Sequence, residues 1–132
     1  MKKRTIVIID DELDFCRILK RNLEELLGFD VFICINGDQG VKLVKRLIPD
    51  LVLLDIAMPG MNGFDVLQRM RSHHATMDIP VVMISALADA RSIEKIAQLH
   101  NGAYLSKPVE ILELQSKISK VLKEEPIEKI KL

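Results

Sequence analysis

Short apolar runs alternate along the chain with longer segments in which apolar residues recur every three or four positions. The runs are rich in Val, Ile and Leu and lack polar alternation, which is typical of parallel strands covered on both faces. We expect five strands, at residues 5–9, 31–35, 51–54, 80–84 and, more weakly, 103–105.

The segments between these runs carry the spacing of amphipathic helices. Five strand–helix units predict an α/β domain, and right-handed crossovers favour a doubly wound sheet with helices on both faces. Gly28 is well placed to end the first helix. The expected apolar positions are Phe15, Leu19, Leu23 and Leu26 in the first helix, Phe64, Leu67 and Met70 in the third, Ile93, Ile96 and Ala97 in the fourth, and Ile111, Leu114, Ile118 and Val121 in the fifth; the second helix, about 38–47, is the least well defined.

Length and charge narrow the functional classes. The chain has 132 residues, enough for one domain, and equal numbers of acidic and basic residues, so no net field draws it to nucleic acid or membrane. Only four Phe and one Tyr are available for base stacking. The basic start is followed by an apolar run too short for a signal peptide, so we expect a cytoplasmic protein with Cys16 and Cys34 as buried thiols.

Polar residues stand at four of the expected strand ends. Asp10 and Asp11 follow the first strand, Asp55 ends the third, Ser85 ends the fourth and Lys107 follows the fifth. Ligands of open α/β sheets bind outside the carboxyl ends of the strands. These side chains should therefore meet at one edge.

Such an edge needs a counter-charge. Two carboxylates about 4 Å apart repel by roughly 4 kcal/mol at an effective dielectric of 20. A divalent cation removes the repulsion, and oxygen ligands without His or Cys suit Mg²⁺ or Mn²⁺. Lys107 and Ser85 would add a positive charge and a hydrogen-bond donor for phosphoryl oxygens. Asp55 is the best candidate nucleophile, because it ends a central apolar strand before a turn rich in Pro and Gly at residues 58–63.

Each of these residues also has an ordinary structural interpretation. Asp10 could be a helix N-cap, Tyr104 a core residue, Ser85 a loop hydroxyl and Lys107 a solvated charge. Their convergence on one edge favours a functional site. The three histidines are expected at the surface, away from this edge: His73, His74 and His100.

The combined motifs resemble the receiver domain of two-component response regulators over residues 5–124. They are Asp10-Asp11, Leu54-Asp55 with Met58-Pro59-Gly60-Met61-Asn62-Gly63, Ser85-Ala86 and Lys107-Pro108. The resemblance implies a flavodoxin-like, five-stranded parallel sheet of order 2-1-3-4-5 with five helices. It also implies a receiver domain at residues 1–125, followed by a tail or the start of a linker at 126–132.

The resemblance implies a role for each residue of the site. Asp55 would accept a phosphoryl group from a phosphohistidine on a sensor histidine kinase or a phosphotransfer protein. Asp11, Asp55 and the main-chain carbonyl of Ala57 would bind Mg²⁺, with Asp10 acting through metal-bound water. Lys107 would pair with the phosphoryl group, and its bond to Pro108 is expected to be cis.

A switch is also implied. Ser85 would move towards the phosphoryl oxygen and Tyr104 would turn inward, changing the surface formed by the fourth helix, fifth strand and fifth helix. That surface would control a downstream protein or an output domain. The protein would be a signalling phosphoacceptor rather than an enzyme, catalysing only its own phosphotransfer and slow dephosphorylation, because apolar Ala57 and Leu87 flank the pocket.

Three alternatives stay open. A phosphohydrolase of the haloacid-dehalogenase kind also uses Asp, Lys and Mg²⁺, but with an Asp-x-Asp arrangement after its first strand, where this chain has adjacent Asp10-Asp11. A nucleotide or flavin binder needs a Gly-rich or hydroxyl-rich first turn rather than three acidic residues. The third alternative is a receiver-like scaffold that is not phosphorylated. The presence of Asp10, Asp11 and Asp55 argues against it. The short segment after Pro126 favours a stand-alone receiver and leaves a fragment of a longer regulator open.

Overall fold

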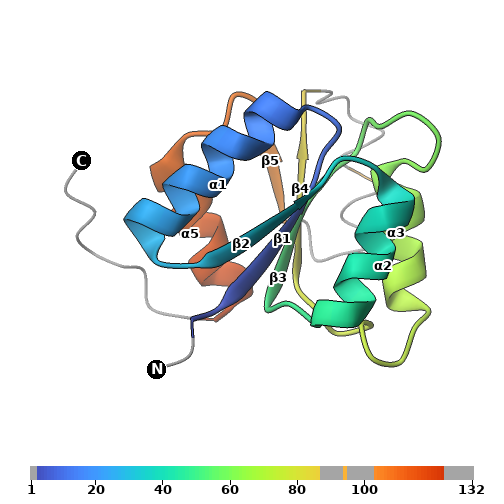
Figure 1. Cartoon of the computed structure of the whole chain (residues 1–132). Coiled ribbons are helices and arrows are strands. Elements are labelled where there is room, and N and C mark those ends of the chain that lie inside the picture. The colour runs from blue at the N-terminus through green and yellow to red at the C-terminus, as the bar shows by residue number, and fades with distance from the viewer. Residues whose placement is uncertain (1–2, 87–93, 95–102, 124–132) are drawn as a thin grey trace.

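A parallel sheet of five strands forms the centre of the protein, with helices on both of its faces (Figure 1). The structure, a computed structural model, describes residues 3–86, 94 and 103–123. The strand order is β2-β1-β3-β4-β5, as predicted. The elements are β1 (Thr5–Ile9), α1 (Leu13–Leu27), β2 (Asp30–Cys34), α2 (Gly37–Leu47), β3 (Leu51–Asp55), α3 (Gly63–Arg71), β4 (Val81–Ser85), β5 (Tyr104–Ser106) and α5 (Ile111–Val121).

Four of the five expected helices lie within the described part of the chain. The fourth, predicted around Ile93, Ile96 and Ala97, falls outside the described residues, as does the expected tail at 126–132. The strands β2 to β5 begin or end one residue away from the predicted bounds, since backbone pairing rather than side-chain polarity sets a strand end.

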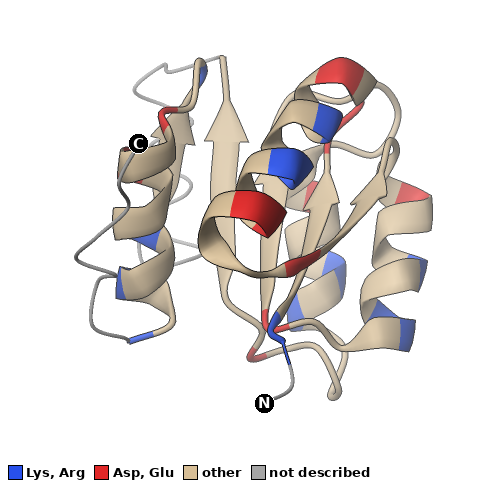
Figure 2. Cartoon of the chain, turned by 60° about the vertical axis from the view of Figure 1, so that its left-hand side comes forward, with Lys and Arg blue, Asp and Glu red and all other residues tan. Residues whose placement is uncertain are grey.

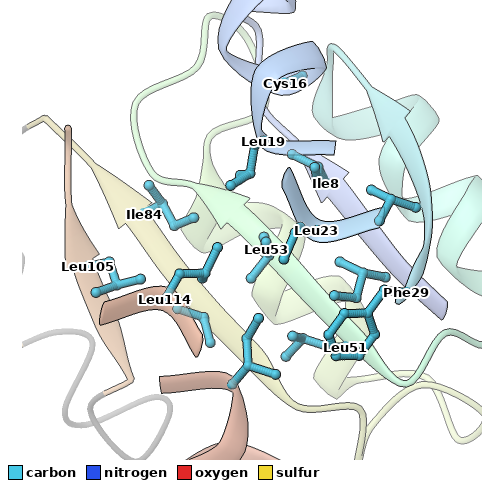
Figure 3. Packing of buried hydrophobic residues seen from close by; sticks show 14 of the residues in the cluster. Ile8, Cys16, Leu19, Leu23, Phe29, Leu51, Leu53, Ile84, Leu105 and Leu114 are labelled. Carbon is cyan, nitrogen blue, oxygen red and sulfur yellow. The ribbon is translucent and has the colours of Figure 1, made fainter. Parts of the chain in front are cut away.

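Two hydrophobic cores hold the layers together. Helices α1 and α5 cover one face of the sheet, and α2 and α3 cover the other (Figure 1). Successive strand residues point to opposite faces, so Ile8 and Leu53 lie in the first core, the α1–α5 core, while Val7 belongs to the second, the α2–α3 core. Figure 3 shows the α1–α5 core, in which Leu23 and Leu114 reach the sheet from the two helices. Both faces are therefore covered, as the uninterrupted apolar runs predicted.

The apolar stripe of α1 differs in part from its prediction. The helix buries Cys16, Leu19 and Leu23, whereas Leu26 is 40% exposed. Leu26 lies in the last turn, where Leu27 packs against the core instead. Gly28 ends the helix as predicted: its φ is +74°, and its N–H donates to the carbonyl of Glu24 at 3.2 Å.

The surface carries both signs of charge. Acidic and basic positions are distributed over the helices (Figure 2), and α1 and α2 each carry an i,i+4 ion pair. In the described part of the chain, no helix has the length and apolar character needed to cross a membrane. Cys16 and Cys34 are both free thiols, Cys16 buried and Cys34 half-buried.

Candidate functional site

The carboxyl edge of the sheet gathers three carboxylates. Parallel pairing aligns Ile9 of β1 with Leu54 of β3, so Asp10 and Asp55 are the next residues at neighbouring strand ends. Carboxylate oxygens of Asp10, Asp11 and Asp55 all lie within 4.8 Å of one another. Asp10 is 1% exposed and Asp55 4% exposed, whereas Asp11 faces solvent. The structure thus brings together the acidic residues predicted from the strand ends.

Asp10 is fixed through its backbone and one carboxylate oxygen. Its N–H donates to the carbonyl of Cys34 at 3.0 Å, and its Oδ1 accepts from the N–H of Glu12 at 2.9 Å. The thiol of Cys16 donates to the Asp10 carbonyl at 3.3 Å. Burial, reinforced by the charge of Asp10, raises the pKa of this thiol to about 12, so it stays a neutral donor. The N-cap residue of α1 is Glu12, which excludes that structural role for Asp10.

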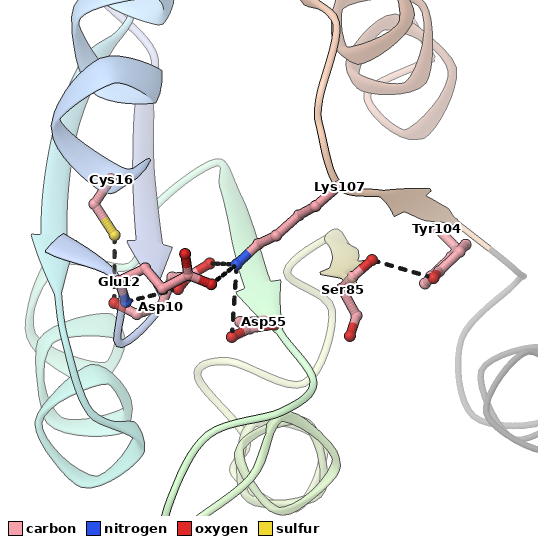
Figure 4. Close-up of polar contacts among 7 residues, drawn as sticks. All are labelled: Asp10, Glu12, Cys16, Asp55, Ser85, Tyr104 and Lys107. Atoms are coloured by element: carbon pink, nitrogen blue, oxygen red, sulfur yellow. Dashed lines mark hydrogen bonds and ion pairs between the residues drawn. The ribbon is translucent and has the colours of Figure 1, made fainter. Parts of the chain in front are cut away.

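Lys107 reaches this acidic cluster from the end of β5 (Figure 4). Its ammonium lies 2.9 Å from Asp10 Oδ2, 2.9 Å from Glu12 Oε1 and 3.9 Å from Asp55 Oδ2. Burial alone would lower the pKa of Lys107, but its contacts with Asp10 and Glu12 outweigh burial and raise the pKa above its ordinary value. Lys107 is therefore a fixed positive charge. The Lys107–Pro108 bond is cis, as the resemblance implied.

The negative charge of the three carboxylates exceeds the positive charge of Lys107, and a divalent cation would balance it. Asp10 Oδ2 is buried, and although Lys107 pairs with it, no described donor forms a well-directed hydrogen bond to it. Burial, and then the charge of Asp10, raise the pKa of Asp55 to about 7, against the opposing effect of Lys107. One ammonium thus leaves the three carboxylates undercompensated. A hard dication with oxygen ligands would complete the compensation.

The loop between β3 and α3 is held tightly against the Asp55 backbone. Gly63 donates to the carbonyl of Ile56 at 2.9 Å, and a Cβ on Gly63 would lie 2.3 Å from the Asp55 carbonyl oxygen. Asn62 and Asp65 form a capping box that starts α3 at this point. Ala57 lies in this loop, exposed, two residues after Asp55. The start of α3 is therefore packed directly against the backbone of Asp55 and Ile56.

Ser85 and Tyr104 lie on the other side of Asp55 from Asp10. Strand β4 separates β3 from β5, and Ser85 lies between Asp55 and Tyr104 in Figure 4. Ser85 is fully buried. The Tyr104 hydroxyl donates to the main-chain carbonyl of Ser85 at 3.4 Å, and the ring packs against the α2–α3 core.

Two neighbours of Lys107 were not predicted from the sequence. Glu12 pairs with its ammonium, and the Phe15 ring centroid lies 4.4 Å from Nζ. The position of Glu12 directly after the aspartate pair was an available signal, whereas Phe15 was assigned only to the core. His73 and His74 are exposed near the end of α3, as expected, and His100 lies outside the described residues.

Comparisons with known proteins agree with this architecture. Residues 6–119 match the family described as the response regulator receiver domain. The probable transcriptional regulator ycf27 of Porphyridium aerugineum is 37% identical over 125 residues, which cover 93% of this chain and 50% of that protein. The DNA-binding dual master transcriptional regulator RpaA of Synechocystis sp. is 38% identical over 120 residues, covering 89% of this chain and 48% of that protein. The chain therefore spans about half the length of these relatives.

A solved structure shows the same similarity in three dimensions. A putative response regulator from Chloroflexus aurantiacus matches with a TM-score of 0.85 and 26% identity, covering 93% of this chain and 100% of that one. Fold, family match and relatives point in the same direction. The chain belongs to the family of response regulator receiver domains, the phosphorylation-controlled modules of two-component signalling.

Proposed function

We propose that Asp55 accepts a phosphoryl group from the phosphohistidine of a partner histidine kinase or phosphotransfer protein. The observation that carries this proposal is the position of Asp55: a 4% exposed carboxylate beside two others and 3.9 Å from the Lys107 ammonium. We further propose that Asp11, Asp55 and the main-chain carbonyl of Ala57 bind Mg²⁺, or Mn²⁺ in its place, with Asp10 acting through water. Bound Mg²⁺ would supply the positive charge that offsets the incoming phosphoryl oxygens.

The transfer forms one bond and breaks one. A carboxylate oxygen of Asp55 attacks phosphorus, the phosphorus–nitrogen bond of the donor breaks, and the imidazole keeps the electron pair and takes a proton from solvent. Lys107 is close enough to pair with a phosphoryl oxygen once the group sits on Asp55. Its raised pKa keeps it charged during this step.

The signal would leave through Ser85 and Tyr104. We propose that the Ser85 hydroxyl turns to a phosphoryl oxygen and that Tyr104 responds, altering the surface of the predicted fourth helix, β5 and α5. That surface would act on a downstream protein or an output domain. The relatives of about twice this length are named transcriptional regulators, which supports an output that controls transcription, with the receiver at residues 1–125 and 126–132 as tail or linker.

The protein would catalyse only its own phosphorylation and a slow loss of the phosphoryl group. We propose that hydrolysis of the aspartyl phosphate is slow, because the side chain of Ala57 has no polar group that could orient a water; Leu87, the other flanking position, lies outside the described residues. The family match gives no support to the phosphohydrolase alternative.

The test is phosphorylation by acetyl phosphate, with and without Mg²⁺, followed by mass spectrometry of the intact protein and its peptides. We expect one phosphoryl group on Asp55, formed only with Mg²⁺ and slowly lost afterwards. Asp55→Asn should remain unlabelled, while Asp38→Asn, which removes an exposed carboxylate on α2, should behave as the wild type. Labelling of the Asp55→Asn variant, or equal labelling in a chelator, would refute the proposal.

A further inference from the structure

Besides its contacts with Asp10 and Asp55, the ammonium of Lys107 has two contacts that were not predicted from the sequence. Glu12 accepts a hydrogen bond from Nζ at 2.9 Å, and the centroid of the Phe15 ring lies 4.4 Å from Nζ. Glu12 directly precedes α1 and Phe15 stands in its first turn, more than 90 positions before Lys107 in the chain. The start of α1 thus contacts the catalytic lysine directly.

These two contacts differ in strength. Glu12 is 63% exposed, so its ion pair is screened by water. The Phe15 ring is partly buried and the Lys107 side chain is 11% exposed, a setting in which a cation close to an aromatic face is held more strongly. Of the two contacts from the start of α1, the ring is therefore the stronger restraint, and it acts beside the buried ion pair between Lys107 and Asp10 Oδ2 at 2.9 Å.

The ring holds Lys107 at a useful distance from the nucleophile. Nζ lies 3.9 Å from Asp55 Oδ2, too far for a hydrogen bond. A closer ion pair would occupy the carboxylate oxygen that must attack phosphorus. At 3.9 Å the ammonium leaves that oxygen free of a direct bond, yet it can reach an oxygen of a phosphoryl group carried by Asp55. Because the ring has no oxygen atom, it restrains Lys107 without becoming a cation ligand.

We propose that Phe15 is a positioning residue for phosphoryl transfer: its ring, together with the ion pairs to Asp10 and Glu12, holds the Lys107 ammonium off Asp55 and in reach of the incoming phosphoryl group. This inference rests on the proposed function of Asp55. The competing explanation is that Phe15 only fills space, since it also packs against the α1–α5 core. A leucine would fill similar apolar space without an aromatic face, and a tyrosine would keep the face.

The first measurement does not depend on phosphorylation. The NMR signals of the Lys107 ε-methylene protons, identified by their loss in Lys107→Arg, should be shifted upfield by the ring current of Phe15. Phe15→Leu should abolish this shift and Phe15→Tyr should keep it. An unshifted lysine in the wild type, or an unchanged shift in Phe15→Leu, would overturn the contact itself.

The second measurement is the rate constant of phosphorylation by acetyl phosphate at saturating Mg²⁺. We expect Phe15→Leu to be slower by about three- to tenfold and Phe15→Tyr to stay within about twofold of the wild type. The Mg²⁺ affinity, titrated separately without phosphodonor, should stay within about twofold in both variants. Phe32→Leu is the matched control, because it removes a ring from β2 that is 42% exposed and belongs to neither core.

The outcomes separate the two proposals. Equal slowing by Phe15→Leu and Phe15→Tyr, or a wild-type rate in Phe15→Leu, would overturn the positioning role while leaving phosphorylation of Asp55 intact. A wild type that is never labelled would overturn the proposed function, and the ring-current shift would still decide whether Phe15 holds Lys107. If Phe15→Leu loses the ring-current shift and is phosphorylated more slowly while Phe15→Tyr is unchanged, both the positioning role of Phe15 and the phosphorylation of Asp55 are supported.

Discussion

At the scale of single residues, the site strongly changes the acidity of Asp55. Burial and the neighbouring Asp10 raise its pKa to about 7, so near neutral pH a proton competes with any cation for this carboxylate. We therefore expect Mg²⁺ affinity to be highest above about pH 7 and to fall by up to about tenfold per pH unit below it. Isothermal titration calorimetry at several pH values measures this dependence.

A matched variant identifies the group responsible. Asp11→Asn removes a solvent-exposed ligand and should weaken Mg²⁺ binding at every pH, while the pH dependence remains and moves slightly to lower pH because the charge of Asp11 helps to raise the pKa of Asp55. Asp55→Asn should bind weakly with little pH dependence over this range. A wild-type affinity that is constant between about pH 5.5 and pH 8 would contradict the raised pKa of Asp55.

The residues of the site divide according to what a sequence can reveal. Asp10, Asp55 and Ser85 were predictable because parallel pairing aligns strand ends, and a residue at a strand end has little freedom of position. The contacts of Glu12 and Phe15 were not, because they depend on the path of one long lysine side chain from a distant segment. The acidic cluster could thus be predicted from strand pairing, whereas the contacts around Lys107 depend on side-chain conformation, which the sequence does not show.

At the scale of elements, the junction between β3 and α3 is tightly constrained at Gly63. A methyl group on Gly63 would lie 2.3 Å from the Asp55 carbonyl oxygen and 2.8 Å from the Ile56 Cα, and neither backbone atom can move alone. We expect Gly63→Ala to lower the free energy of unfolding by roughly 2–3 kcal/mol and to reduce phosphorylation of Asp55, because the strand end must shift. Chemical denaturation and acetyl phosphate labelling measure the two effects.

Gly28 provides the control for this substitution. Its φ is outside the range favoured by alanine, at +74°, unlike that of Gly63, but a Cβ at Gly28 would meet nothing within 4 Å. Gly28→Ala should therefore cost only about 1 kcal/mol, from the left-handed backbone, and leave labelling unchanged. Equal stability of the two variants would show that the junction accommodates a side chain.

The elements themselves were largely predictable. Uninterrupted apolar runs identified the central strands β1, β3 and β4, because a strand buried on both faces has no polar positions to confuse the pattern. The edge strands β2 and β5 are partly exposed, and the run that predicted β5 was the weakest. Leu26 was assigned to the core incorrectly, since spacing alone does not show where the last turn of α1 leaves the sheet. Strand bounds shifted by one residue for a similar reason: apolar character marks burial, whereas backbone hydrogen bonds define the strand.

At the scale of the whole molecule, the two cores stabilise the fold, whereas the carboxylates gathered at the site lower its stability. The α1–α5 and α2–α3 cores cover both faces of the sheet, and the carboxyl edge between them concentrates like charges. A carboxyl group whose pKa is raised on folding binds its proton more tightly in the folded state. Its ionisation therefore destabilises the fold as pH rises from about 4 to about 7. The ionised carboxylate of Asp55, the proposed phosphoacceptor, therefore destabilises the metal-free protein.

The final prediction follows from this opposition. A shift of about three pKa units corresponds to up to roughly 4 kcal/mol, so Asp55→Asn should be more stable than the wild type by about 1–4 kcal/mol at about pH 8 without Mg²⁺. The difference should vanish below about pH 3, where Asp55 is protonated in both the folded and the unfolded wild type. Lys107 does not alter this window, because its raised pKa keeps its stabilising charge throughout. Denaturant unfolding measures these values.

Magnesium should reverse the order of stability. Saturating Mg²⁺ binds the folded wild type through Asp55 and raises its unfolding free energy, whereas Asp55→Asn, with its ligand oxygen charge removed, should gain little. Asp38→Asn, which neutralises a carboxylate on the exposed face of α2, should follow the wild type at every pH and Mg²⁺ concentration. If Asp55→Asn were no more stable than Asp38→Asn at about pH 8 without Mg²⁺, the like charges at the sheet edge would not strain the fold, and cation binding would lack the driving force argued for it.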